Sequence, residues 1–304
     1  VAQRFGAKDQ TGLRKFVANS VWLSIVFAVI MTIVTCILCR QIMTWMRTPA
    51  DIFEDANTYI FIIFIGIPAT YLYNLVSGII RSLGDSRSPL FFLIVSSVLN
   101  IGLDFLFILT FHMGVAGAAW ATVISQAVSG IGCLFYMKHK FEILKIRPEE
   151  WKMDTKYMKI LCGMGIPMGL QYSITAIGSV ILQTAVNTLG SSAVAAITAG
   201  SKVSMFFCCP YDAMGSTMAT YAGQNAGAGK TDRIRQGVRS ATFIGSIYSV
   251  LACIVLTLFG GVIPLLFVDA SETVVIHQAH QFLTFNSLFY IPLTIVNVWR
   301  FTIQ

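Results

Sequence analysis

Apolar stretches long enough to cross a lipid bilayer constrain this chain more than any other feature of its sequence. About eight of them follow one another, separated by short polar connections. Because the bilayer core holds no water to satisfy backbone N–H and C=O groups, stretches of this length must form helices. We therefore predict an all-α, polytopic membrane protein, with spans at roughly 17–39, 56–80, 89–111, 115–137, 159–188, 192–221, 240–267 and 278–304.

The composition supports a membrane protein over a nucleic-acid-binding one. Only 12% of the residues are charged, and the mean hydropathy is +0.73. The net charge of +7 comes from basic residues in the short connections, as in cytoplasmic loops of membrane proteins. We thus expect the bilayer, and no nucleic acid, as a partner. The seven cysteines all lie in apolar stretches, where buried thiols act as small hydrophobic side chains.

Basic and non-basic connections alternate along the chain, which predicts its orientation. Lys and Arg gather in the connections at 1–15, 81–87, 138–159 and 230–239, whereas the intervening ones are acidic or uncharged. By the positive-inside rule, we expect a plasma-membrane protein with the amino end of this chain in the cytoplasm. The connection at 138–158 is the only one with room for structure of its own.

An internal repeat divides the chain into related parts. Residues 1–17 align with 222–238, and the shift of 221 residues continues without a gap to the acidic turns at Asp51 and Glu272. One period contains an even number of spans, so both copies start on the same membrane side, a plan common in secondary transporters. Two complete units would hold about twelve helices, so we expect roughly two further helices at each end. The predicted domains are an amino-terminal lobe at 1–137, an inter-lobe loop at 138–158 and a carboxy-terminal lobe at 159–304.

A carboxylate inside an apolar span is the strongest functional signal. An Asp at a helix centre costs about 2.5 to 3.5 kcal/mol to insert, so Asp104 is a candidate site residue. Asn100 lies one turn earlier on the same face, and Thr122 of the next span lies at the depth of Asp104, about 10 Å from the outer boundary. These oxygens suit a small cation, and Asp104 alone could bind a proton. The alternative is an Asp that only holds helices together.

Five runs of residues stand out together by their order and spacing: Asn74–Pro89, Asn100–Asp104, Gly114–Thr122, Gly165–Gln171 and Gly223–Lys230. They resemble the multidrug and toxic compound extrusion (MATE) family of cation-coupled exporters, and the likeness covers the whole chain. The resemblance implies two six-helix lobes, a central cavity that opens alternately to each side, and drug export against sodium or protons.

The resemblance also implies an ion site in the amino-terminal lobe. In the family this site uses an Asn and an Asp of helix five, a hydroxyl of helix six and an Asp of helix one. The first three fall on Asn100, Asp104 and Thr122, which would bind sodium if sodium is the coupling ion. The fourth is expected on a preceding helix.

Candidates for the substrate path lie in the second half of the chain. Lys202 lies near mid-membrane, where its ammonium group is expected to face a water-filled cavity or a structural partner. Gln171, Tyr172 and Phe206 are further candidates, because aromatic faces attract lipophilic cations. Lipid contact or ordinary packing is the alternative for each of them.

Glycine and proline suggest two special backbone features. Gly165 and Pro167 interrupt the span at 159–188, which predicts a helix that bends between states; close packing through small residues is the alternative. The glycine-rich run at 223–231 lacks the spacing of a phosphate-binding loop, since Gln224 stands where that loop needs glycine. A helix-ending turn explains this run better.

Taken together, the residues and the resemblance predict a transporter and not an enzyme. We expect a monomeric secondary active transporter that exports lipophilic, often cationic compounds by antiport with sodium or protons, with no cofactor besides the coupling ion. A flippase for lipid-linked precursors and a non-transporting membrane scaffold are the alternatives. An intramembrane hydrolase would need a catalytic pair at matching depth, and the sequence offers none.

Overall fold

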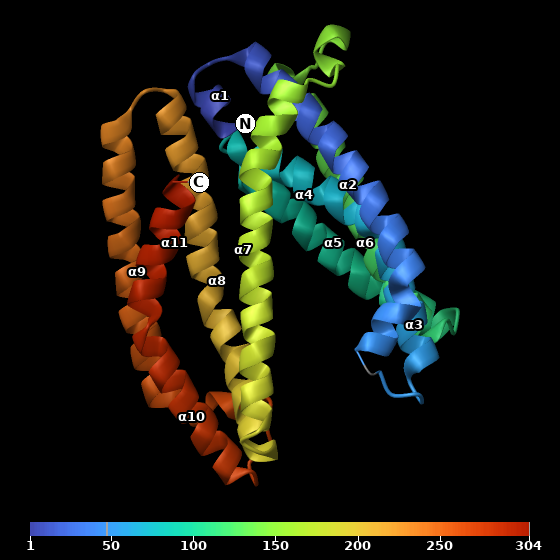
Figure 1. Cartoon of the computed structure of the whole chain (residues 1–304), viewed down its shortest axis with the longest axis vertical. Coiled ribbons are helices and arrows are strands. Elements are labelled where there is room, and N and C mark those ends of the chain that lie inside the picture. The colour runs from blue at the N-terminus through green and yellow to red at the C-terminus, as the bar shows by residue number, and fades with distance from the viewer. Residues whose placement is uncertain (47, 304) are drawn as a thin grey trace. The chain divides into compact units, whose positions relative to one another are not determined.

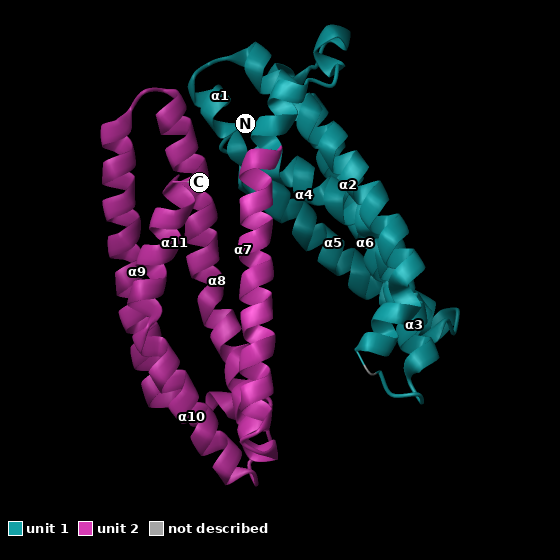
Figure 2. Ribbon diagram, in the orientation of Figure 1, with its two compact units in different colours: residues 1–161 teal, residues 162–304 magenta. Residues whose placement is uncertain are grey.

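Figure 1 shows the computed structural model of the chain, which describes residues 1–46 and 48–303. Every regular element in these two ranges is a helix, which confirms the predicted all-α class. The helices form two compact units, residues 1–161 and 162–304 (Figure 2). By length and composition, six helices could cross a membrane, or eight if each bent pair forms one span. The chain is therefore a multi-pass membrane protein.

The first unit contains the three candidate ion-site residues, Asn100, Asp104 and Thr122. Its long helices begin and end close to the predicted spans, and the side chain of Asp9 caps α2 by accepting the N–H of Gly12 at 2.8 Å. Its elements are α1 (Ala2–Gly6), α2 (Gln10–Trp45), α3 (Phe53–Ile65), α4 (Ile67–Ser82), α5 (Arg87–Phe105), the π-helical turn η1 (Leu106–Thr110), α6 (Gly114–Lys140), the 3-10 turns η2 (Glu142–Leu144) and η3 (Pro148–Trp151), and the start of α7.

The second unit contains the candidate substrate-path residues. The predicted span at 240–267 is too long, because its helix ends at Phe259, before two glycines and a short 3-10 turn that contains Pro264. Its elements are α7 (Thr155–Asn187), α8 (Ser191–Gly227), α9 (Thr231–Phe259), η4 (Ile263–Leu266), α10 (Thr273–Leu288) and α11 (Tyr290–Ile303).

Two of the predicted spans are pairs of helices bent at a break. The α3–α4 pair bends by 43° and the α10–α11 pair by 47°. A proline follows each break, Pro68 in α4 and Pro292 in α11, and neither can donate the N–H that would bond to the carbonyl one turn earlier. The bent pairs occupy equivalent places in the sequence repeat, so the repeat is also a repeat of three-dimensional structure.

The connection at 138–158 is folded onto α2. The guanidinium of Arg14 pairs with Glu150 at 2.8 Å, and both side chains are nearly buried. Asn19 accepts the backbone N–H of Asp154 at 2.9 Å. This connection thus belongs to the first unit, whose boundary falls inside α7, while the assignment of 138–158 as an inter-lobe loop remains a prediction.

Candidate functional site

Asp104 lies at the end of α5, two residues before the π-helical turn η1. Such turns are rare and frequently mark functional sites. The residue is half-buried, and its Oδ1 atom is fully buried with no hydrogen-bond partner among the described residues. It lines an open surface pocket of about 310 Å³, whose other lining residues are apolar side chains of the same helix and turn. A buried carboxylate oxygen without a donor is unfavourable unless a proton or a cation neutralises it.

Asn100 and Thr122 are brought together by the contact between α5 and α6. The Nδ2 atom of Asn100 donates to the Oγ1 atom of Thr122 at 3.5 Å, and Thr122 in turn donates to the carbonyl of Ala118 at 3.0 Å. No hydrogen bond joins Asp104 to Thr122 in the described structure. The hydroxyl of Thr122 contacts the Asn100 carboxamide instead, whereas the sequence analysis paired it with the Asp104 carboxylate. To offer its oxygen to a cation, the Asn100 amide would have to turn over.

Three polar residues that the sequence analysis did not propose for the site extend this arrangement. Gln126 lies one turn from Thr122 on α6, and its amide oxygen accepts a hydrogen bond from the hydroxyl of Thr70 on α4. Asn74, one turn further along α4, donates to the backbone carbonyl of Thr70 at 3.0 Å. The four-residue spacing of Thr122 and Gln126, and of Thr70 and Asn74, was the signal that could have identified them.

Two glycines allow the helices to approach one another around Thr122. A Cβ atom on Gly66, at the α3–α4 break, would lie 2.4 Å from Cγ2 of Val123. A Cβ atom on Gly117 would lie 3.0 Å from the Cβ of Phe107 in the π-helical turn. The bend and the π-helical turn are therefore both held against α6 within two turns of the candidate site.

The candidate ligand set consists of one carboxylate and two neutral oxygens. The described residues contain no group of three or more His, Cys, Asp or Glu side chains that could hold a metal ion. An arrangement of Asp104 with Asn100 and Thr122 carries a single negative charge, which matches a monovalent cation or a proton better than a divalent ion. These donors fit the sodium or proton that the resemblance implies.

Lys202 on α8 is exposed, and its ammonium group lies 5.6 Å from the ring centroid of Phe267. Phe267 follows η4 in the connection between α9 and α10. This cation–π contact shows that Lys202 reaches towards a connection between helices, which its position in the apolar span did not suggest. Whether Lys202 also contacts substrate remains a prediction.

The aromatic substrate-path candidates are exposed on two helices. Tyr172 on α7 is 61% exposed and Phe206 on α8 is 76% exposed, whereas Gln171 is half-buried. The ring of Phe206 lies 5.9 Å from that of Phe207. These rings have the free faces that a lipophilic cation would need, and their role remains a prediction.

The interruption expected at Gly165 and Pro167 is absent. The helix α7 continues from Thr155 to Asn187 with Pro167 inside it. A Cβ atom added to Gly165, or to its neighbours Gly163 and Gly169, would meet no atom of the described residues within 4 Å. The proposed bending of this helix remains a prediction.

A buried set of hydroxyl groups in the second unit was missed from the sequence. Tyr211 on α8 bonds to Ser249 on α9 at 2.9 Å, and Ser249 bonds to Thr294 on α11 at 3.0 Å. The hydroxyl of Tyr290, the first residue of α11, bonds to Ser204 at 3.2 Å. These contacts fix α11 directly after the break that separates it from α10.

The sequence model of a family described as MatE matches residues 1–106 and 167–304. The chain is 28% identical over 290 residues to "Probable multidrug resistance protein YoeA" of Bacillus subtilis (strain 168), covering 93% of this chain and 62% of that protein. It is 30% identical over 292 residues to "Probable multidrug resistance protein YpnP" of the same strain, covering 95% of this chain and 64% of the relative. The chain thus spans less than two thirds of either relative.

A solved structure shares the fold of the chain. It is described as the outward-facing conformation of a multidrug resistance MATE family transporter of the MOP superfamily. The TM-score is 0.90 at 22% sequence identity, and the match covers 99% of this chain and 70% of that one. The fold is therefore shared over nearly the whole of this chain.

Proposed function

The chain belongs to the MatE family, and on that premise we propose that the complete protein exports lipophilic, often cationic compounds by antiport with sodium or protons. The names of its relatives support a multidrug substrate range. The observation that carries the ion coupling is the buried, unpartnered Oδ1 atom of Asp104 next to the Asn100–Thr122 pair. We further propose that the complete protein is a monomeric transporter of the plasma membrane without enzymatic activity, and that the amino end of this chain lies in the cytoplasm.

In the proposed mechanism, Asp104 binds the coupling ion and changes the balance between two openings of the transporter. A bound ion can shift that balance only by the difference between its affinities for the two states. Such a difference arises when one opening buries the unpaired carboxylate more than the other, because burial without a partner disfavours the charge and so favours a neutralising ion. Asn100 and Thr122 would exchange their mutual hydrogen bond for contacts with the ion, which links occupancy to the contact between α5 and α6.

The proposal is tested by Asp104→Asn in the complete protein. This change keeps the shape of the side chain and removes its charge, so coupled drug efflux is expected to be lost while the amount of protein in the membrane is unchanged. Asp212→Asn is the matched control, because Asp212 is an exposed carboxylate on α8. Normal efflux by the Asp104 variant would remove this residue from the coupling mechanism.

A flippase for lipid-linked precursors is less well supported. Such a protein would need several cationic side chains along its substrate path to bind the phosphates of the precursor. Among the candidate substrate-path residues, only Lys202 is cationic. Transport of a neutral lipophilic compound or a lipophilic cation by the purified protein would distinguish the exporter from the flippase.

A further inference from the structure

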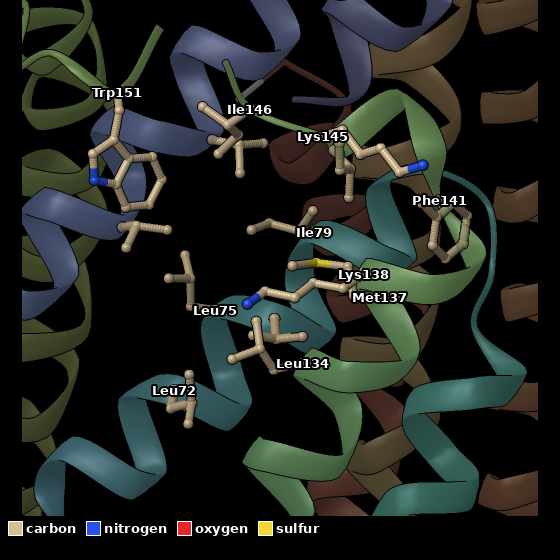
Figure 3. Close-up of a pocket in the computed structure, with 14 residues that line it drawn as sticks. Leu72, Leu75, Ile79, Leu134, Met137, Lys138, Phe141, Lys145, Ile146 and Trp151 are labelled. Atoms are coloured by element: carbon tan, nitrogen blue, oxygen red, sulfur yellow. The ribbon is translucent and has the colours of Figure 1, made fainter. Parts of the chain in front are cut away.

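A cavity inside the first unit shares no lining residue with the pocket at Asp104. Its volume is about 590 Å³, within the range of about 300 to 1,000 Å³ typical of small-molecule sites. It is enclosed by α2, α4, α6 and the connection after α6 (Figure 3). Twelve of its fourteen lining residues are apolar, and the other two are Lys138 and Lys145. An apolar cavity with two cations selects for a ligand that has both an apolar part and a negative charge.

The cavity extends from the basic connection into the apolar layer. Leu72 lies ten residues before the end of α4 at Ser82, or about 15 Å along the helix axis. Leu134 lies six residues before the end of α6 at Lys140, or about 9 Å. This depth suits an extended hydrocarbon chain better than a compact molecule.

The two lysines are available for an anion. Lys138 forms no hydrogen bond, ion pair or ring contact with any described residue, and Figure 3 shows its ammonium group extending across the cavity beside Leu75. Lys145 pairs with Glu142 at 3.0 Å, but both side chains are mostly exposed, so the pair is weak and exchangeable. A negatively charged head group would give Lys138 the partner that the protein itself does not provide.

The wall formed by the connection is held in place before any ligand binds. The indole N–H of Trp22 on α2 donates to the carbonyl of Trp151 at 2.9 Å, and the two rings lie 6.1 Å apart. The nearly buried Arg14–Glu150 pair fixes the adjacent residue. The side of the cavity that Trp151 forms is therefore preorganised, which lowers the entropic cost of binding.

We propose that this cavity binds one anionic phospholipid, with an acyl chain along Leu72, Leu75 and Leu134, the phosphate at Lys138, and Lys145 adding positive charge at the opening. A neutral lipid would offer no negative charge to Lys138, and a small soluble anion would leave the apolar depth unfilled. The cavity opens at the basic side of the membrane protein, where anionic lipids of the cytoplasmic leaflet are attracted to Lys and Arg. This site is independent of ion coupling at Asp104.

The test is lipid retention by the complete protein, measured by native mass spectrometry in detergent with added phosphatidylglycerol or phosphatidylcholine of the same acyl chains. One phosphatidylglycerol is expected to stay bound in preference to phosphatidylcholine. The double variant Lys138→Gln/Lys145→Gln is expected to lose about fivefold in affinity for each lysine removed. Lys152→Gln is the matched control, because Lys152 is an exposed lysine of the same connection that does not line the cavity.

Filling the cavity tests the acyl-chain site without a change of charge. Leu75→Trp is expected to remove the bound phosphatidylglycerol while both lysines remain. Equal retention of the two lipids by the wild type would overturn the proposal, as would equal losses in the double variant and the Lys152 control. Unchanged lipid retention in Leu75→Trp would mean that another part of the complete chain fills the cavity, which also overturns it. The lysine variants keep the test decisive if the tryptophan prevents folding, because both changed side chains are exposed.

Discussion

Thr122 belongs to the predicted ion-binding set, and in the structure it contacts a second member of that set, Asn100. Its Oγ1 atom accepts from Asn100 and donates to the carbonyl of Ala118, so its own proton is directed away from Asp104. A cation between Asp104 and Thr122 would thus find an oxygen lone pair and not a competing proton. Asp104 carries the single negative charge of the ligand set. The neutral oxygens of Asn100 and Thr122 refine the selectivity of the site for one ion over another.

Replacing Thr122 by Val keeps the shape of the side chain and removes the oxygen. We expect the affinity for the coupling ion to fall about tenfold, the effect of losing one interaction with a charged partner. The measurement is the ion concentration that half-maximally raises the unfolding temperature of the complete protein. Thr198→Val is the matched control, since Thr198 on α8 also donates to the carbonyl four residues earlier. Equal shifts in the two variants would show that Thr122 is not a ligand.

Asp85, in the connection between α4 and α5, provides a second prediction at a single residue. Burial alone would raise the pKa of its carboxyl, but hydrogen bonds from Lys140 at 2.8 Å and from Ser88 and Tyr136 outweigh burial and hold the pKa well below its usual range. A carboxyl whose pKa is lower in the folded state stabilises the fold above its unfolded pKa of about 3.9. That contribution is lost as the pH falls below this value.

Asp85→Asn is therefore expected to lower the free energy of unfolding by about 1 to 2 kcal/mol at pH 7. The difference between variant and wild type is expected to shrink as the pH falls below about 4, because the unfolded chain then binds a proton at this carboxyl whereas the folded chain does so only at lower pH. Unfolding in detergent at a series of pH values measures both effects. A constant difference down to pH 3 would contradict the assignment of the stabilisation to the ionised carboxylate.

Hydropathy predicted the spans but not the bends within them. The α3–α4 and α10–α11 pairs are each apolar enough on average to cross a membrane, and a proline near a helix start looks the same in sequence as one inside a bent span. The π-helical turn after Asp104 was also not predicted, and the close approach of its residue Phe107 to Gly117 is visible only in the structure. Conversely, Pro167 suggested a break that the continuous helix α7 does not contain. Spacing along one helix identified Asn100 and Asp104, whereas contacts between helices required three-dimensional structure.

The α3–α4 break yields a prediction for a whole element. Gly66→Ala would bring a Cβ atom within 2.4 Å of Cγ2 of Val123 and force α6 away from the bend. We expect a loss of about 1 to 3 kcal/mol in unfolding free energy, as for other overpacked sites. Gly78→Ala in α4 is the control, because its Cβ would meet no atom within 4 Å and alanine favours the helix. If both variants unfold at the same temperature, the close contact at Gly66 does not support the fold.

For the whole molecule, the repeat of 221 residues was the most informative property of the sequence. It predicted parallel, related halves, and the structure shows bent pairs of 43° and 47° at equivalent places in them. The neighbours of Asp104 could not be predicted from the sequence, because they depend on which atoms of α5 and α6 come into contact. The chain also covers only 62% and 64% of the two Bacillus relatives, so further parts of the complete protein can contribute to the site.

The central claim is that transport of substrate is coupled to an ion bound at Asp104. Its most direct test is the movement of sodium and protons from vesicles that contain the complete protein, recorded while a gradient of a lipophilic cation drives exchange. We expect an opposing flux of one of these ions that depends on substrate and disappears in Asp104→Asn. Substrate movement without any opposing ion flux, or an unchanged flux in that variant, would contradict the claim.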